Sequence, residues 1–244
     1  MPHLLAADLA ATDSPALRSM TCNACYYLLA RGDTRTGHDL AADLRQHWRE
    51  RLGDDDHYTL TAGTYLAWAL LDVGRNADAR DLNQDILDRR RRILGADHPG
   101  TLIPASNLAV ALGALGEVQA ARDLDQDTLD RRRRVLGADD RYTLMSANNL
   151  ATELRALGEV QAARELDQDT LDRRRRVLGA DHPDTLDSAN SLAADLRALG
   201  EHRAARELDE DTLARYRRVL GEDHPDTQRS ASNLAEDLRA LGQA

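Results

Sequence analysis

Asparagine, arginine and aromatic side chains recur in this sequence at intervals of 42 residues, and they are the groups best suited to hold a ligand. An asparagine amide can pair with a peptide backbone through a donor and an acceptor, and an arginine can hold a carboxylate with two hydrogen bonds. The candidates are Tyr26, Tyr65, Trp68, Asn107, Asn148, Asn149, Arg155, Asn190, Arg197, Asn233 and Arg239. The aromatic members come first along the chain. A matching ligand is therefore an extended peptide with an aromatic or aliphatic anchor at one end and acidic groups or a free carboxyl terminus at the other.

A second interpretation of these residues stays open. The asparagines and arginines can be solvated side chains on a helix face, and Tyr26 and Trp68 can fill space between adjacent helices.

Two other groupings could hold a metal ion or carry redox chemistry, and neither is complete. Cys22 and Cys25 have the C-x-x-C spacing, but they fall inside a predicted helix and no further cysteine exists to complete a zinc site. We expect structural thiols there. The histidines of three His-Pro pairs, His98, His182 and His224, lie one or more repeats apart, about 10 Å for packed helices. They are expected to be loop or helix-cap residues, and no metal site is predicted.

The composition argues against an enzyme. The sequence contains no lysine, so all 32 basic residues are arginine, which excludes a Schiff-base lysine and a complete G-x-x-x-x-G-K-[ST] phosphate loop. Aspartates and glutamates are numerous, yet none forms a pair that the repeat does not copy, whereas an active site is a unique constellation in a cleft. We expect no catalytic residue and no cofactor.

These residues are carried by a repeat that runs through the chain. Shifting the sequence by 42 residues aligns two glycine series. The first is Gly32, Gly74, Gly116, Gly158, Gly200 and Gly242, and the second, after leucine, is Gly53, Gly95, Gly137, Gly179 and Gly221. Such self-similarity indicates a stacked-repeat solenoid, in which each unit buries its apolar face on its neighbours. The absence of phenylalanine and the wealth of leucine and alanine also favour packed helices.

Each repeat is predicted to form two helices. The first begins at the proline of a His-Pro pair, because proline fits the first helical turn, and ends at the first glycine series. Leucines at i, i+4 and i+7, such as Leu150, Leu154 and Leu157, mark its buried face. The second helix, from about Val118 to Leu136 in one repeat, has paired alanines after the turn that allow the two helices to approach closely.

The period divides the chain into six segments after an incomplete start. Residues 1–14 are expected to end the helix and loop of a preceding unit. The repeats are expected at 15–56, 57–98, 99–140, 141–182 and 183–224, followed by the first helix of a sixth at 225–244. We predict one all-α domain, a right-handed α-solenoid of antiparallel helix pairs. The half-units at the two ends indicate a fragment or processed piece of a longer protein, with polar end caps as the alternative.

Runs of arginine near the ends of the second helices could bind nucleic acid, but a structural role fits them better. Asp127 stands four residues before Arg131, and this acid-first order suits the helix dipole. Asp130 repeats the spacing before Arg134. The runs are Arg89 to Arg92, Arg131 to Arg134 and Arg173 to Arg176.

The overall charge supports that choice. The formal net charge is −10, whereas general nucleic-acid binding depends on a positive surface. One arginine column is Trp48 at one end and Tyr216 at the other, so its stems are expected to cover apolar surface. We expect no nucleic-acid partner.

Cysteine content and hydropathy indicate a cytoplasmic protein. Two cysteines are too few for a disulfide framework, which suggests a reducing compartment. No apolar run approaches the roughly 20 residues of a membrane span, and the first residues lack the pattern of a secretory signal.

The motif Leu-Gly-x-Asp-His-Pro-Asp-Thr-Leu, followed by Asn-Asn-Leu-Ala at 148–151 and Leu-Gly-Glu with Ala-Ala beyond, resembles the 42-residue tetratricopeptide repeats of kinesin light chains. The resemblance covers almost the whole chain. It implies that the first helices line a concave groove, on which the candidate residues above would lie, and that asparagines such as Asn107 and Asn149 contact a bound peptide.

The arginine-rich form of the repeat, at 204–215 and 232–242, is similar to the C-terminal arrays of actinobacterial signalling NTPases that carry an NB-ARC-type ATPase. That resemblance implies a sensor or interaction arm of a larger protein. The expected function is therefore a non-enzymatic peptide-binding or protein-binding scaffold. The alternative is a structural arm that self-associates through its unfinished ends, where Leu234, Leu238 and Leu241 lack a second helix.

Overall fold

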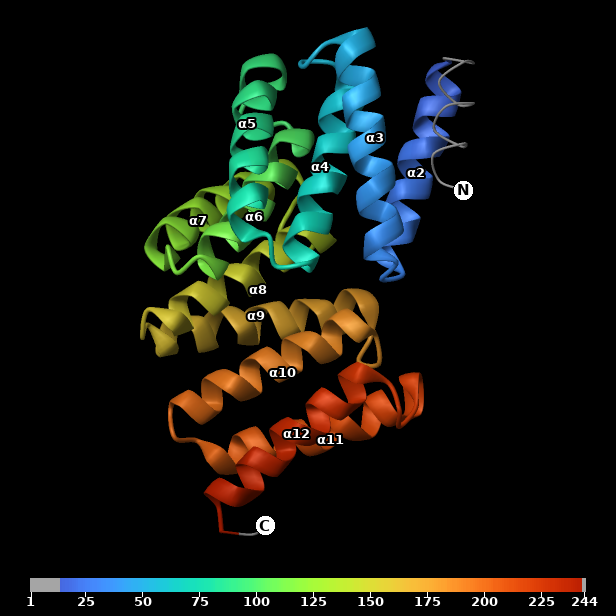
Figure 1. The fold of residues 1–244 in the computed structure, drawn as a ribbon. Helices are drawn as coiled ribbons and strands as arrows, with labels where there is room; N and C mark the ends of the chain where they lie inside the picture. The colour runs from blue at the N-terminus through green and yellow to red at the C-terminus, as the bar shows by residue number, and fades with distance from the viewer. Residues whose placement is uncertain (1–13, 243–244) are drawn as a thin grey trace. The chain divides into compact units, whose positions relative to one another are not determined.

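The computed structural model describes residues 14–242, and within that range the chain forms eleven α-helices and no β-strand (Figure 1). The helices are α2 (Pro15–Ala30), α3 (Thr34–Leu52), α4 (His57–Asp72), α5 (Asn76–Leu94), α6 (Pro99–Ala114), α7 (Val118–Val135), α8 (Arg141–Ala156), α9 (Val160–Leu178), α10 (Pro183–Ala198), α11 (His202–Leu220) and α12 (Pro225–Ala240). The predicted all-α repeat array is confirmed. The segment assigned to the end of a preceding unit lies, up to residue 13, outside the described residues.

The chain forms two compact units, Met1–Leu124 and Asp125–Ala244. In the first unit α2 to α6 pack in sequence order, and the first helices α2, α4 and α6 also contact one another. In the second unit α8 to α12 do the same, with α8, α10 and α12 in contact. First helices therefore form a layer of their own in each unit. The division into repeats and the single solenoid domain remain predictions.

Histidines cap three of the first helices, as predicted. Nδ1 of His98 accepts a hydrogen bond from the backbone N–H two residues further on at 3.0 Å, and His182 and His224 do so at 3.1 and 3.2 Å. Asp56 and Asp140 take this role where the sequence has no His-Pro pair.

Glycine ends the first helices, and α6 shows how. The N–H of Glu117 bonds the carbonyl of Leu112 at 2.9 Å, and the N–H of Gly116 bonds that of Gly113 at 3.0 Å. This pair of bonds is a Schellman motif, and it needs the left-handed conformation that Gly116 adopts with φ of 82°.

Only one alanine of each predicted pair lies in the contact between helices. Ala121, Ala163 and Ala205 are fully buried, whereas the alanine before each is exposed. In the first repeat Gly37 takes this place, and a Cβ there would lie 2.5 Å from Leu29 Cδ2. Helices α2 and α3 therefore approach even more closely than an alanine would allow.

The first and fourth arginines of the runs bind acids of their own chain. Arg173 bonds Asp169 one turn earlier at 2.8 Å and Asp139 of the preceding inter-repeat loop at 2.8 Å, while Arg176 lies 3.5 Å from the same Asp139. Arg215 and Arg218 bind Asp181 in the same way, and Arg89 and Arg92 bind Asp55.

The predicted pair of Asp127 and Arg131 forms at 2.7 Å. Asp130 lies 3.9 Å from Arg133. The structural interpretation of the arginine runs is supported by these ion pairs.

The second arginine of each run is buried and joins two repeats. Nη1 of Arg174 donates to the carbonyl of Asp184 at 2.6 Å and to Ser188 Oγ at 2.8 Å, which ties α9 to α10. Arg132 makes the same two bonds to Tyr142 and Ser146 and is 1% exposed. This column was expected to cover apolar surface, but its guanidiniums also provide hydrogen bonds inside the interface.

We predict that Arg174→Met lowers the free energy of unfolding by about 2 kcal/mol, because it removes both hydrogen bonds of a buried guanidinium and leaves the buried Ser188 hydroxyl without its donor. Arg175→Met is the matched control, since Arg175 is exposed and 3.9 Å from Asp172, and it should cost less than about 0.5 kcal/mol. Urea unfolding followed by circular dichroism measures both. Equal losses in the two variants would contradict the proposed tie.

Candidate binding surface

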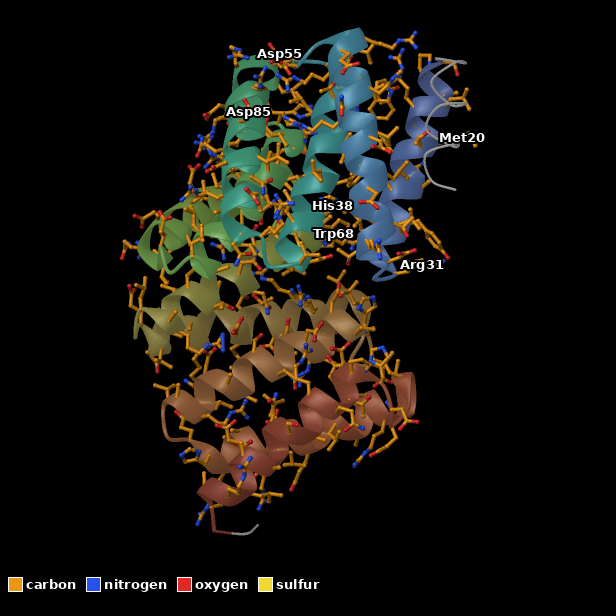
Figure 2. The ribbon with its side chains drawn as sticks, viewed as in Figure 1. Met20, Arg31, His38, Asp55, Trp68 and Asp85 are labelled. Carbon is orange, nitrogen blue, oxygen red and sulfur yellow. The ribbon has the colours of Figure 1, made fainter. Side chains whose placement is uncertain are left out.

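Three aromatic side chains predicted to bind a ligand form one cluster on α2 and α4. The ring centroid of Tyr26 lies 6.4 Å from that of Tyr65 and 6.0 Å from that of Trp68, which lies near the C-terminal end of α4 (Figure 2). Tyr26 is 47% exposed, and the other two are half-buried. Burial raises the pKa of Tyr65 to about 12, so its hydroxyl stays neutral. The cluster offers an open aromatic face to an apolar or aromatic group.

The predicted asparagines differ in their availability. Asn148 is engaged between α8 and α10, where its Nδ2 donates to Ser191 Oγ at 3.0 Å and its Oδ1 accepts from Ser188 at 3.1 Å. Asn190 is 8% exposed, and neither atom of its amide has a hydrogen-bond partner among the described residues. Asn107 on α6, Asn149 on α8 and Asn233 on α12 are half-buried, as Asn148 is.

Two of the predicted arginines already face carboxylates of their own chain. Nε of Arg155 lies 3.2 Å from a carboxylate oxygen of Asp195, and its Nη2 lies 4.0 Å from one of Asp167. Arg197 repeats the arrangement at 2.6 Å from Asp209 and 3.2 Å from Asp237.

Each guanidinium therefore lies between an acid of its own repeat's second helix and an acid of the next first helix. Arg239, on α12, is exposed. The 42-residue pattern predicts that Arg155 and Arg197 face a ligand, whereas both guanidiniums contact aspartates of their own chain.

The acids that face these arginines were missed as a group. Asp167, Asp195, Asp209 and Asp237 are fully buried, and they sit in pairs between a second helix and the following first helix. The sequence does contain a sign of these acids, since a shift of 42 residues aligns Asp167 with Asp209 on the second helices. It does not indicate burial, because an aspartate on a highly charged helix is expected to be solvated.

A further pair, Asp125 and Glu153, is also buried, at 0% and 7% exposed. Neither oxygen of Asp125 has a hydrogen-bond partner among the described residues. Burial raises the pKa of Asp125 to about 8, the nearby Glu153 adds to the rise, and Arg132 opposes it. Burial likewise raises the pKa of Glu153 and of Asp167, where Asp195 adds repulsion. These carboxyls hold protons at pH values where exposed ones have lost them.

The two cysteines are buried and reduced, as expected of structural thiols. Burial raises the pKa of Cys22 to about 11 and that of Cys25 to about 12, so neither is a nucleophile near neutral pH. Within residues 14–242 no three metal-binding side chains gather at one place. In the same range, every helix is too short or too polar to cross a bilayer.

Comparison with known families gives a consistent result. A family model described as Tetratricopeptide repeat matches residues 143–184 and again 185–226, and a second model of the same description matches residues 64–134. These matches cover more than half of the chain. None of the curated proteins matches the sequence.

Several solved structures share the fold. A kinesin light chain of Podosopora anserina with nearly identical TPR-like repeats superposes with a TM-score of 0.69 at 24% identity, covering 89% of this chain and 99% of the other. BtubC (BKLC) from P. vanneervenii gives 0.67 at 17% identity, covering 95% and 86%. A Rap protein complexed with competence and sporulation factor gives 0.57 at 12% identity, covering 93% and 65%.

The raised pKa of Asp125 predicts that stability falls as pH rises. Its carboxyl is ionised in the unfolded chain above its ordinary pKa of 3.8 but stays protonated in the folded chain up to about 8. The folded state thus binds more protons in this window, and the free energy of unfolding should fall by up to about 1.4 kcal/mol per pH unit for one such proton. Urea unfolding at several values between pH 5 and 8 measures the slope.

Asp125→Asn should reduce this slope by the contribution of one proton, because the amide fills the same volume without a proton to lose, while the other buried carboxyls keep theirs. Asp127→Asn is the matched control on the same helix, since Asp127 is half-buried and paired with Arg131, and it should leave the slope unchanged. If the free energy of unfolding of Asp125→Asn had the same dependence on pH as that of the parent, the proton would be bound by a group other than Asp125.

Proposed function

Because the chain belongs to the tetratricopeptide repeat family, we propose that it is a non-enzymatic scaffold that holds an extended peptide or protein segment against its first helices. The observation that carries the proposal is the cluster of Tyr26, Tyr65 and Trp68, because two neighbouring first helices place three aromatic rings on one partly exposed surface. Aromatic residues at such surfaces contribute much of the binding energy in protein recognition. A fold neighbour, the Rap protein, was solved with a bound factor, which supports a binding role for this kind of array.

The ligand we propose has an aromatic or aliphatic anchor for this cluster and acidic groups or a free carboxyl terminus. Asn107, Asn149 and Asn233 are half-buried and suited to its backbone. Arg239 is exposed, whereas Arg155 and Arg197 are half-buried. Of the three predicted arginines it is therefore the best placed to meet a carboxylate. Arg155 and Arg197 would contribute only through donors that their buried aspartates leave unused.

We further assign the array to the sensor or interaction arm of a larger bacterial signalling NTPase in the cytoplasm. This assignment is supported by the similarity of the arginine-rich repeats to the arrays of NB-ARC proteins. The coding sequence around this chain tests it, because a nucleotide-binding domain in the same reading frame is required.

We predict that Trp68→Ala weakens peptide binding at least tenfold. The probe is a ten-residue synthetic peptide that begins with tryptophan and ends in aspartate and glutamate with a free carboxyl group, and isothermal titration calorimetry measures its affinity. Tyr27→Ala is the matched control, since Tyr27 is a tyrosine of α2 that is 64% exposed and lies outside the cluster. Its ring centroid lies 5.8 Å from the guanidinium carbon of Arg31. It should change affinity less than twofold. The proposal fails if both variants bind like the parent or if no peptide of this type binds.

Self-association through α12 is the second candidate, and one observation favours it. Leu234, Leu238 and Leu241 are only half-buried, whereas Leu192 and Leu196 on α10 are 4% and 7% exposed. Under this candidate the mean mass in light scattering rises with protein concentration in the absence of peptide, and Leu238→Glu keeps it at the single-chain value. A mass that stays constant over concentration in the parent removes this candidate.

A further inference from the structure

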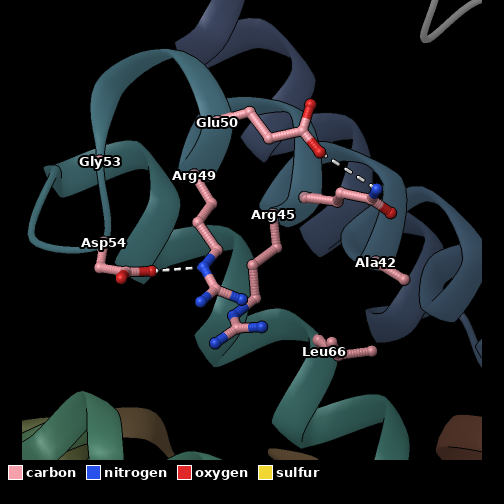
Figure 3. A pocket seen from close by; sticks show the side chains of 8 residues that line it. Ala42, Arg45, Arg49, Glu50, Gly53, Asp54 and Leu66 are labelled. Atoms are coloured by element: carbon pink, nitrogen blue, oxygen red, sulfur yellow. Dashed lines mark hydrogen bonds and ion pairs between the residues drawn. The ribbon is translucent and has the colours of Figure 1, made fainter.

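A pocket of about 580 Å³ lies on the first unit, between α3, the loop that follows it and α4 (Figure 3). Two arginines of α3, Arg45 and Arg49, extend into it with their guanidiniums beside each other, and Leu66 of α4 forms an apolar wall. The pocket is separate from the aromatic cluster. Several residues at the pocket differ from their counterparts in the later repeats.

The first departure is Arg45 itself. At the equivalent position the later repeats have a leucine that is almost fully buried, at 1% to 4% exposed; these are Leu87, Leu129, Leu171 and Leu213. In the first repeat a cation replaces this core residue, and its side chain is 27% exposed.

The second departure makes room for that arginine. Gly63 of α4 stands where the later repeats have alanine, as at Ala105, Ala147 and Ala189. A Cβ at Gly63 would lie 3.2 Å from Nε of Arg45 and 2.9 Å from Cδ1 of Ile86. An alanine would therefore crowd the guanidinium, so the two substitutions belong together.

Two more departures line the same pocket. Ala42 stands where the next three repeats have a glutamine that bonds an aspartate four residues on, as Gln84 bonds Asp88 at 2.9 Å, so this volume is left open. Asp54 stands where the next three repeats have an alanine and pairs with Arg49 at 2.6 Å, a pair that Arg217 and Glu222 repeat at 2.8 Å in the fifth. Arg45, Ala42 and Asp54 thus line one cavity, and Gly63 lies against Arg45.

The charges around the pocket leave Arg45 without a close counterion. Arg49 is paired with Asp54, and Arg89 is paired with Asp85 at 2.7 Å and with Asp55 at 2.8 Å. Among residues 14–242, Arg45 reaches only to Asp85, at 4.0 Å.

Burial lowers the pKa of Arg45, and the neighbouring cations Arg49 and Arg89 lower it further, while Asp85 and Asp54 oppose them. The remaining acid of the wall, Glu50, accepts a hydrogen bond from Gln46 at 3.2 Å. One half-buried positive charge therefore faces the cavity without a tightly bound partner.

We propose that this pocket binds a small organic carboxylate, whose oxygens meet the guanidiniums of Arg45 and Arg49 and whose short aliphatic part lies against Leu66. A planar guanidinium matches a carboxylate with two parallel hydrogen bonds. A single negative charge balances the single uncompensated cation, whereas a phosphate dianion would also meet Asp54 and Asp85. The site is independent of the peptide surface, because no residue is shared between them.

The test uses the full chain and three probes: butyrate, butylammonium and inorganic phosphate. Binding is measured by isothermal titration calorimetry and by the shift of the thermal unfolding midpoint with ligand concentration. The parent should bind butyrate saturably and should bind neither of the others. The variant Arg45→Leu with Gly63→Ala restores the residues that the later repeats pack in their cores, so it should fold, and its affinity for butyrate should fall at least tenfold.

Arg91→Leu is the matched control, because Arg91 is the exposed counterpart of Arg49 in the next repeat and lies outside the pocket. Its affinity for butyrate should stay within twofold of the parent. Unchanged binding in the double variant, absence of butyrate binding to the parent, or binding of phosphate in place of butyrate would each overturn the proposal. Circular dichroism shows that the double variant is folded before it is titrated.

Discussion

In the middle repeats a buried arginine in the last turns of the second helix ties that helix to the first helix of the next repeat. Arg132 and Arg174 each give one guanidinium nitrogen to a backbone carbonyl and a serine hydroxyl of the following helix. Arginine suits this position because its planar fork can bond two acceptors at once and is more weakly hydrated than an ammonium group. A desolvated cation is costly unless its partners are in place, so the interface strongly favours one register.

This constraint separates the polar residues of the array into two groups. Asn148, Arg155 and Arg197 contact the neighbouring repeat and keep the helices in register, although their residue types alone would suit a ligand. The aromatic cluster on α2 and α4 and the arginine pocket on α3 are less occupied by internal partners. Both lie in the first unit, where the repeat has diverged most from its later copies.

Internal copies make that divergence informative. Leu87 of the second repeat, at 1% exposure, occupies the position equivalent to Arg45 and serves only to pack the core. Arg45 at the same position, together with Gly63 opposite, therefore needs a different explanation from packing alone. In a protein built from copies, the later repeats act as a reference for the function of the first.

The helix boundaries could be predicted from the sequence because proline and glycine determine them locally. The caps at His98 and its equivalents follow from the same chemistry, since a side chain before proline is close to the orphan N–H groups. The buried acids could not be predicted, because the hydrophobic period shows which face is apolar but not which aspartate on it is opposite an arginine of another helix. Asp125 and Asp127 look alike in sequence, yet one is buried and the other is partly exposed. The role of Arg45 could not be predicted from its own helix either, because it is recognised as a replacement of a core leucine only when all copies of the repeat are aligned.

The most direct test of the central claim is a double-mutant cycle between Arg174 and Ser188 across the α9 and α10 interface, measured by urea unfolding of the parent, Arg174→Met, Ser188→Ala and the double variant. If the arginine binds the serine as described, the losses are not additive, and the coupling free energy is at least about 0.5 kcal/mol. Losses that add within about 0.3 kcal/mol would show that the two side chains do not interact, and the proposed basis of the repeat register would be wrong.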